Sequence, residues 1–298
     1  MDYHVPVMLN ECVEALAIKK DGIYVDVTFG GGGHSKAIDA QLDGGKLFAF
    51  DQDTDAQKNC WDSPHLNFIN QNFRHLKRYL KLYNAIPIQG LFADLGISSH
   101  QIDVPERGFS FRYDADLDMR MGSAEISAAD ILNTYSPEQI AKVLWEYGEL
   151  GNSRKLAAEI VAFRGQKSFK RINDLLQVLE PFAGSMPNKF YARVFQTLRM
   201  EVNQELDALK EMLEQSLEVL DTGGRLVVLS YHSLEDRLVK NFMKTGRVDG
   251  VQQKDFYGNI ERPFRVITKK PMLPSKAEVK RNSRARSAKL RIAEKVKL

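Results

Sequence analysis

The sequence predicts an α/β fold: a doubly wound, mostly parallel sheet into which an all-α domain is inserted. Residues 23–94 alternate short β-rich runs with helical ones, as parallel strands joined by crossover helices do. From about residue 100 to 204 the apolar residues follow helical spacing without strand-like runs, and the alternation then resumes. We therefore expect a discontinuous core, residues 1–100 and 205–298, and a helical insertion, residues 101–204.

The first four predicted strands are short apolar runs that end where polar residues begin. They cover 23–29, 46–51, 66–70 and 88–94. In an open α/β sheet, ligands bind beyond the carboxyl ends of the strands, so the residues that follow these runs should meet in one crevice. They are Gly30 to His34, Asp51, the region of Phe73, and Asp94.

The insertion and the C-terminal part contain recognisable helix starts. Ser136, Pro137 and Gln139 match a capping box with proline at the first helical position. Ser233 and Asp236 match a second capping box, for a helix through Met243. The other expected elements are helices at 154–164, 172–180, 189–200 and 202–220, a turn at 221–224, a strand at 225–231, and an antiparallel edge pair at 264–268 and 287–294.

The composition is that of an ordinary globular protein, with 43% hydrophobic and 27% charged residues. Neither a signal-peptide pattern nor a run of 18 apolar residues occurs, so we expect a cytoplasmic protein without a membrane partner. The two cysteines, Cys12 and Cys60, belong to no CxxC or Cys/His cluster. No disulfide framework or cysteine-rich zinc site is therefore indicated, and we expect no metal.

Basic residues are concentrated at the C-terminal end. Residues 262–298 contain 13 Lys and Arg against Glu278 and Glu294, a net charge of +11, which leaves −8 on the preceding residues because the whole chain carries +3. Such a segment attracts a phosphate backbone, although a solvated tail is an equally simple interpretation of the charge alone.

A glycine-rich turn, Gly30 to Gly33, joins the first strand to a helix, and a backbone without side chains lets a ligand lie against it. Nicotinamide dinucleotide sites have a similar turn, but the spacing here is not G-x-G-x-x-G. Asp26 instead lies four residues before Gly30, an arrangement common in adenosylmethionine sites. Asp51, at the tip of the next strand, is placed to accept hydrogen bonds from both ribose hydroxyls with an ionised carboxylate. The alternative is that Asp51 caps a helix that begins at Thr54.

Asp94 ends the fourth strand, where methyltransferases present groups to cofactor and substrate. The small residues that follow, 95–99, suit the close approach of a flat base, whereas a buried structural aspartate is the alternative. Methylation of a pyrimidine ring carbon needs a thiolate, and neither cysteine lies on this loop. An exocyclic amine or a hydroxyl is therefore the better methyl acceptor.

A series of sequence blocks resembles the bacterial ribosomal RNA small-subunit methyltransferase H family, also called MraW. They include VPVMLNE (5–11), DVTFGGGGHS (26–35), DLGISSHQID (94–103), PERGFSF (105–111), DLDMRM (116–121), RVFQTLRMEVNQEL (193–206), SYHSLEDRLVK (230–240) and NSRARSAKLR (282–291). The resemblance implies a class I, Rossmann-like methyltransferase fold with S-adenosylmethionine as cofactor. It further implies methylation of the N4 amine of a cytosine in the decoding region of 16S rRNA, with the small ribosomal subunit as partner.

The resemblance also implies roles for particular residues. The implied cofactor contacts are Gly32, Gly33, His34, Asp51, Phe73, Asp94 and Gln101. Phe73 would pack the adenine, although its pattern equally fits a core aromatic; a helix cap is the alternative for His34, and a surface amide for Gln101. The candidate catalytic residues are Asp94, Ser98, Ser99 and His232, with Ser233, Glu235 and Asp236 nearby. Which group accepts the proton stays open, since His232 fits a base or a hydrogen-bonding role.

Two departures from the family pattern concern RNA contact and loop structure. His100 replaces the usual proline, and Lys189 is the single strong base in residues 183–192, where the family is basic. Arg107 and Arg112 are candidates for phosphate contact or base stacking, with surface salt bridges as the alternative. The rival functions are a non-catalytic RNA-binding ribosome-assembly factor and an NAD-dependent oxidoreductase, and both a monomer and a homodimer fit the sequence.

Overall fold

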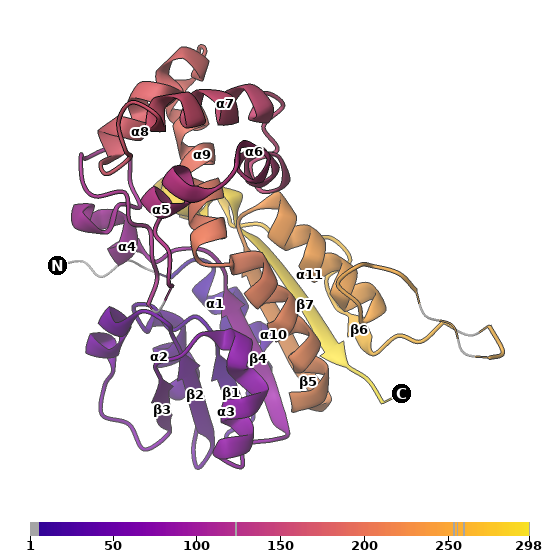
Figure 1. Ribbon diagram of the computed structural model, residues 1–298. Coiled ribbons are helices and arrows are strands. Elements are labelled where there is room, and N and C mark those ends of the chain that lie inside the picture. The colour runs from indigo at the N-terminus through magenta and orange to yellow at the C-terminus, as the bar shows by residue number, and fades with distance from the viewer. Residues whose placement is uncertain (1–5, 123, 253, 255, 259, 298) are drawn as a thin grey trace. The chain divides into compact units, whose positions relative to one another are not determined.

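The computed structural model describes residues 6–122, 124–252, 254, 256–258 and 260–297, without the side chain of Ser99. The chain forms two compact units (Figure 1). The first, which we name the sheet unit, consists of Met1–Gly96 and Leu206–Leu298. The second, which we name the helical unit, is Ile97–Glu205.

The sheet unit is built on one sheet, which has seven strands among the described residues in the order β3-β2-β1-β4-β5-β7-β6. The strands are β1 (Ile23–Asp26), β2 (Lys46–Phe50), β3 (Leu66–Ile69), β4 (Ile88–Asp94), β5 (Leu220–Ser230), β6 (Phe264–Val266) and β7 (Lys289–Lys295). The first five run parallel, and β7 pairs antiparallel with both β5 and β6. This confirms the predicted doubly wound, mostly parallel sheet with an antiparallel pair at its edge.

Helices cover both faces of this sheet because its strands are apolar on both sides. Leu47 packs in the core under α1 (Leu9–Ala15) and α2 (Gly33–Asp39). Its neighbours Phe48 and Phe50 point to the other face. That face is covered by α3 (Leu76–Leu82), α10 (Glu205–Val219) and α11 (Ser233–Thr245). The remaining elements of this unit are α12 (Lys276–Arg281) and the 3-10 helices η1 (Thr54–Asn59), η2 (Phe73–His75) and η5 (Ser283–Ser287).

The helical unit has a separate apolar core, which includes Ile131, Leu144, Leu156 and Leu198. Its elements are α4 (Ser99–Asp103), η3 (Pro105–Arg107), α5 (Ala128–Thr134), α6 (Pro137–Glu146), α7 (Ser153–Arg164), α8 (Ile172–Leu179), η4 (Glu180–Phe182) and α9 (Pro187–Val202). The predicted capping box of α6 is confirmed, because Ser136 Oγ accepts from the Gln139 amide and the Gln139 side chain accepts from Ser136 N.

Three predicted elements were wrong in detail. The helix expected over 202–220 begins three residues later, as α10 at Glu205, because α9 continues to Val202 and Gln204 then adopts a positive φ of 49°. The expected turn at 221–224 is a bulge inside β5, where pairing with β4 shifts register. The cap of α11 is His232 with Glu235, and not Ser233 with Asp236.

Asp236 has a structural role instead of capping: its carboxylate accepts from Arg291 Nε at 2.5 Å and from Lys289 Nζ at 3.2 Å. It thereby ties α11 to β7. No helix in the part of the chain that the structure describes has the length and apolar character needed to cross a membrane.

Candidate functional site

The glycine turn between β1 and α2 is tightly enclosed by side chains. Gly32 has φ 75°, and a Cβ there would lie 3.1 Å from the rings of both Phe29 and Trp61. A Cβ on Gly33 would lie 2.2 Å from Cγ of Pro6. We expected these glycines to make room for a ligand, but at Gly33 the close neighbour in the structure is Pro6. The N-terminal segment, residues 6–8, therefore covers the Gly33 end of the turn.

His34, on the first turn of α2, is buried and binds the same N-terminal segment. Its Nε2 lies 3.0 Å from the carbonyl oxygen of Val7. Since a carbonyl can only accept, Nε2 donates, and burial lowers the pKa of His34 to about 4, so the ring is neutral near pH 7. Nδ1 is then an acceptor, 3.8 Å from Oδ2 of Asp94. The two groups do not form an ion pair, and together they present acceptors suited to a cation or an N–H donor.

Asp26, at the end of β1, holds the turn in place. Oδ1 accepts from the Thr28 amide at 2.9 Å and its hydroxyl at 3.2 Å, and Oδ2 accepts from Ser35 Oγ at 2.6 Å. Thr28 Oγ1 in turn accepts from Asp94 N at 2.7 Å. The aspartate four residues before Gly30 thus orders the backbone of β1, α2 and the end of β4.

Asp51 lies after β2 and faces the glycine turn. Oδ2 accepts from Gly30 N at 2.7 Å, and Oδ1 accepts from Asp53 N at 2.8 Å. Burial raises its pKa to about 6. The alternative role as a helix cap belongs instead to Asp53, whose side chain accepts from Asp55 N at the start of η1. Each Asp51 oxygen keeps a further lone pair for a ligand hydroxyl.

Asp94 and Tyr231 form a half-buried pair at the ends of the adjacent strands β4 and β5. Tyr231 donates its hydroxyl to Oδ1 of Asp94 at 2.8 Å. Burial raises the pKa of Asp94 to about 7, against the lowering effect of this hydrogen bond. Burial, aided by the Asp94 charge, also raises the pKa of Tyr231, so the phenol stays protonated as the donor. The sequence interpretation missed Tyr231, although the rule that ligands bind at carboxyl strand ends points to it.

His232, next to Tyr231, caps α11. Its Nδ1 accepts from Leu234 N at 3.3 Å, while Glu235 Oε2 accepts from the amides of Tyr231 and His232, both at 3.1 Å. Glu235 therefore fixes the backbone that presents Tyr231 to Asp94. The ring of His232 lies at the same strand end as the Asp94 pair.

Phe73 begins η2 beyond the end of β3 and packs partly against the sheet core. The preceding Asn72 donates to Gln52 Oε1 at 2.7 Å, which links this segment to the residue after Asp51. Within the sheet unit, the predicted residues Gly32, Gly33, His34, Asp51, Phe73, Asp94 and His232 therefore all lie at the carboxyl edge of the sheet.

Ser98 and Gln101 belong to the helical unit and follow Asp94 along the chain. They form a capping box at α4, in which Ser98 Oγ accepts from Gln101 N at 3.2 Å and Gln101 Oε1 accepts from Ser98 N at 3.0 Å. Gln101 is buried, so the alternative of a surface amide is wrong. The predicted role of Ser99 concerns a side chain outside the described part of the chain.

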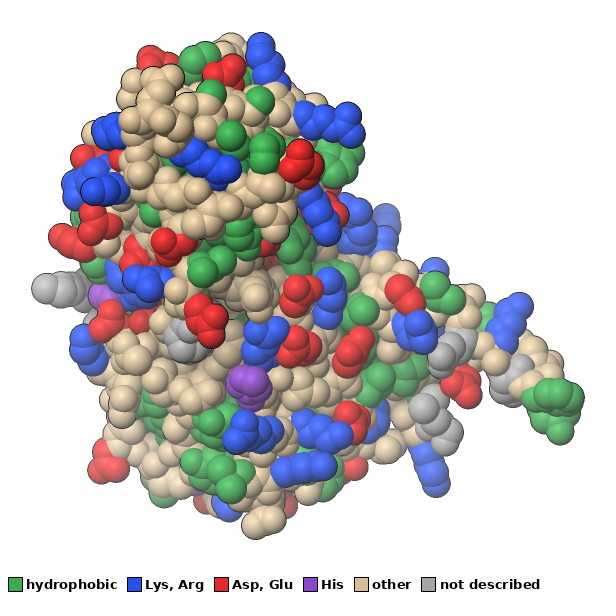
Figure 2. Space-filling view, in the orientation of Figure 1, with side chains coloured by type: hydrophobic (Ala, Val, Ile, Leu, Met, Phe, Trp, Pro, Cys, Tyr) green, Lys and Arg blue, Asp and Glu red, His purple; other side chains and the backbone are tan. Residues whose placement is uncertain are grey.

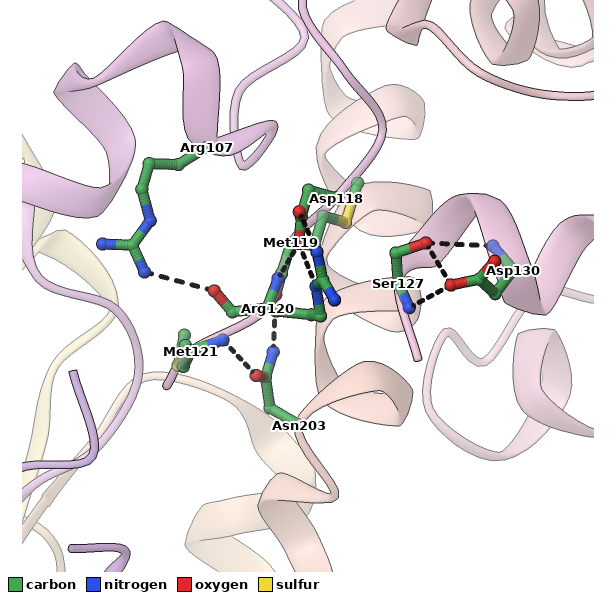
Figure 3. Close-up of polar contacts among 8 residues, drawn as sticks. All are labelled: Arg107, Asp118, Met119, Arg120, Met121, Ser127, Asp130 and Asn203. Atoms are coloured by element: carbon green, nitrogen blue, oxygen red, sulfur yellow. Dashed lines mark hydrogen bonds and ion pairs between the residues drawn. The ribbon is translucent and has the colours of Figure 1, made fainter. Parts of the chain in front are cut away.

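The DLDMRM segment of the helical unit is bonded both to Asn203, the residue after α9, and to Arg107 (Figure 3). Asn203 donates to Met119 O at 2.8 Å and accepts from Met121 N at 2.7 Å. Arg107 donates to Arg120 O at 3.1 Å. Arg120 itself forms a bidentate pair with Asp118 at 2.8 and 2.7 Å. Two neighbouring sequence blocks and the distant Asn203 thus order this loop.

The MraW methylase family matches residues 1–296 of this chain. The chain belongs to that family. The ribosomal RNA small subunit methyltransferase H of Bacteroides thetaiotaomicron is 53% identical over 298 residues, covering 99% of this chain and 98% of that protein. The protein of the same name from Parabacteroides distasonis is 55% identical over 298 residues, with the same coverage. Membership in the MraW methylase family, with the sheet described above, confirms the predicted class I methyltransferase fold and S-adenosylmethionine as cofactor.

Proposed function

We propose that this protein methylates the N4 amine of a cytosine in the decoding region of 16S rRNA, with the small ribosomal subunit as its substrate. The full-length similarity to proteins named for small-subunit ribosomal RNA supports the choice of RNA. The observation that carries the chemistry is Asp94, a carboxylate with a pKa near 7 at the edge where the proposed cofactor residues lie. An amine acceptor needs such a group, because it loses a proton.

The cofactor fits the carboxyl edge of the sheet. S-adenosylmethionine supplies an electrophilic methyl group on a positively charged sulfur. Asp51, oriented by Gly30 N and Asp53 N, would accept the ribose hydroxyls. The acceptors of His34 and Asp94 would favour the cationic end. The remaining proposed contacts are Gly32, Gly33, Phe73 and Gln101.

Asp94 would accept the proton of the reaction. As the amine nitrogen bonds the methyl carbon, the carbon–sulfur bond breaks with its electron pair on sulfur, and one N4 proton passes to the carboxylate. A base with a pKa near the working pH is the most efficient. Tyr231 would tune this pKa, because its hydrogen bond favours the ionised form. Ser98, Ser99 and His232 would orient the cytosine.

The helical unit would recognise the RNA around the cytosine. Its exposed Arg112, and Arg107 in the ordered loop of Figure 3, offer guanidinium groups for phosphate contact or base stacking. The unit follows Asp94 directly along the chain, which suits a substrate-recognition role.

The test is methyl transfer from tritiated S-adenosylmethionine to small subunits from a strain lacking this gene. We expect label in 16S rRNA at one decoding-region cytosine, located by mapping the modified nucleotide, and none in subunits that already carry the modification. Absence of label on subunits and on free 16S rRNA would favour the non-catalytic assembly factor. Label on a different atom or nucleotide would overturn the proposed position while retaining the enzyme class.

A further inference from the structure

Helix α12 presents a charged face that the proposed methyl transfer does not use. Lys276, Lys280 and Arg281 are exposed, whereas Glu278 and Val279 on the same helix are half-buried. Lys276 and Lys280 lie one turn apart and so share a face. Arg286, on the following η5, is also exposed. We name Lys276, Lys280, Arg281 and Arg286 the α12 basic face.

The charges of this face are not neutralised within the described part of the chain. No described carboxylate lies within ion-pair distance of its four side chains. Some other basic side chains in the sheet unit do have acidic partners. Examples are Arg74–Glu211, Lys77–Glu218, Arg225–Glu294, Arg247–Asp249 and Arg291–Asp236. On the face of the molecule in Figure 2, basic and acidic side chains are likewise interspersed. The four cations of the α12 basic face are therefore available to an anion from outside the described part of the chain.

The α12 basic face lies beside the proposed cofactor site. Glu278 Oε1 accepts from Met8 N at 2.7 Å. Met8 directly follows Pro6 and Val7, which contact Gly33 and His34. The inner side of α12 is thus bonded to the segment that covers the glycine turn.

An electrostatic effect on Cys12, in α1, agrees with this location. Burial raises the pKa of the Cys12 thiol well above its ordinary value, and the carboxylates of Asp94, Glu11, Glu278 and Asp26 raise it further. The pKa of the thiol is thus raised by the charge of Asp94, at the end of β4, and by that of Glu278, on the inner side of α12. The cations point outward from a helix whose other side adjoins the reaction edge.

We propose that the α12 basic face binds the phosphate backbone of the RNA substrate next to the cofactor site. This inference rests on the proposed function, since it takes RNA as the substrate. Four exposed cations suit a polyanion with regularly spaced charges, because each phosphate of a nucleic-acid backbone can be neutralised by a Lys or Arg side chain. Residues 1–261 carry a net charge of −8, which repels RNA. A local group of basic residues is therefore needed to hold RNA at this edge.

The experiment compares the triple variant K276Q/K280Q/R281Q with a matched control, K20Q/K46Q/K81Q. The control also removes three exposed charges, but from the opposite edge, where β1, β2 and β4 begin. Binding of 16S rRNA transcribed in vitro is measured from about 50 to 200 mM salt, a range over which phosphate contacts weaken strongly. Methyl transfer to undermethylated subunits and calorimetric binding of S-adenosylmethionine are measured in parallel.

We expect the triple variant to bind the transcript about tenfold or more weakly, with a salt slope reduced by about two to three, because each lost phosphate contact removes about one. KM for subunits should rise, while kcat and cofactor affinity stay as in wild type. The control should match wild type throughout. Equal RNA affinity in the triple variant and wild type would overturn the proposal and leave the face to another anionic partner.

Two further outcomes separate the possible failures. If wild type binds the transcript but methylates no RNA, the proposed function fails. The comparison of RNA affinity between the triple variant and wild type still tests whether the α12 basic face binds RNA. If the triple variant loses cofactor binding, its RNA affinity no longer reports on the face alone. The salt dependence of RNA binding is then measured for the single variants K276Q and K280Q. Each should lower the salt slope by about one, and unchanged slopes would contradict the proposal.

Discussion

Two aspartates end neighbouring strands, yet they have opposite surroundings. Asp26, after β1, is buried and accepts three hydrogen bonds, from Thr28 N, Thr28 Oγ1 and Ser35 Oγ. Asp94, after β4, keeps a quarter of its side chain exposed, and Tyr231 is the one described residue that donates to its carboxylate. A carboxylate satisfied by its own fold orders the backbone, whereas one with spare acceptor capacity is available to a ligand. This difference separates a scaffold residue, Asp26, from Asp94, for which we propose a role in the reaction.

The isosteric change Asp94→Asn is the strongest test of this contrast. It removes the proposed proton acceptor while keeping the shape, so kcat for methyl transfer should fall about 10²- to 10⁴-fold, the usual share of a general base. Single-turnover transfer to undermethylated subunits measures this effect, with cofactor binding by calorimetry as the check that the site still forms. Retention of wild-type kcat would remove Asp94 from the chemistry.

The stability of Asp94→Asn provides an independent test. Burial raises the folded pKa of Asp94 to about 7, above its value in the unfolded chain. The stability contribution of the protonated carboxyl is therefore present at low pH and is lost as pH rises through about 7. The amide that replaces the carboxyl cannot ionise, so the variant should melt at a higher temperature than wild type at pH 8, and this gain should vanish near pH 4. A variant that is less stable at pH 8 would contradict the raised pKa.

The same substitution at Asp26 should have the opposite outcome. Asp26→Asn replaces one acceptor oxygen by an amide donor and leaves the bonds to Thr28 and Ser35 only partly satisfied. Burial raises the pKa of Asp26 as well, but the three hydrogen bonds that this substitution disturbs outweigh the gain from removing the charge. We expect a net loss of about 1–3 kcal/mol in the free energy of unfolding, measured with denaturant at pH 7. Once folded and saturated with cofactor, the variant should retain most of its kcat. A large loss of kcat at full cofactor saturation would indicate that Asp26 also takes part in methyl transfer.

We propose that Tyr231 tunes the pKa of Asp94, so Tyr231→Phe should shift the pH profile of methyl transfer and leave the proposed site residues in place. Without the phenol hydrogen bond the ionised carboxylate is less stable, and its pKa should rise by about one unit. Activity should therefore fall about tenfold at pH 6 and little at pH 9. The measurement is kcat as a function of pH. A uniform loss at every pH would indicate a purely structural role.

The strands were predictable because each is an apolar run ending at a polar residue, and the glycine turn with its flanking aspartates follows from them. The capping residue of α11 could not be predicted, because SYHSLED contains two overlapping capping patterns. The choice depends on where β5 ends, and its pairing with β4 and β7 decides that. The break before α10 likewise depends on Asn203, whose side chain binds Met119 and Met121, distant in sequence.

The site shows the same limit. Asp51 and Asp94 are visible in the sequence as charged residues at strand tips, whereas Tyr231 looks like one more residue of an apolar strand. Its importance comes from a hydrogen bond across 137 residues of chain. The contact of Pro6 with Gly33 is also long-range, and no local pattern reveals it.

Glu278 extends the comparison to a third carboxylate, and its effect should be the smallest. It resembles Asp26 in binding the backbone, since Oε1 accepts from Met8 N, but it is half-buried and makes this one described bond. In Glu278→Gln a neutral oxygen can replace the carboxylate, which weakens the bond by about 0.5–1.5 kcal/mol. Because Met8 follows the residues against Gly33 and His34, we expect the Kd for S-adenosylmethionine to rise about two- to fivefold while kcat is unchanged. Glu14→Gln, on the exposed side of α1, removes the same charge without a backbone bond and should leave Kd unaltered. Equal effects of the two substitutions would mean that net charge, and not the tie to Met8, controls cofactor affinity.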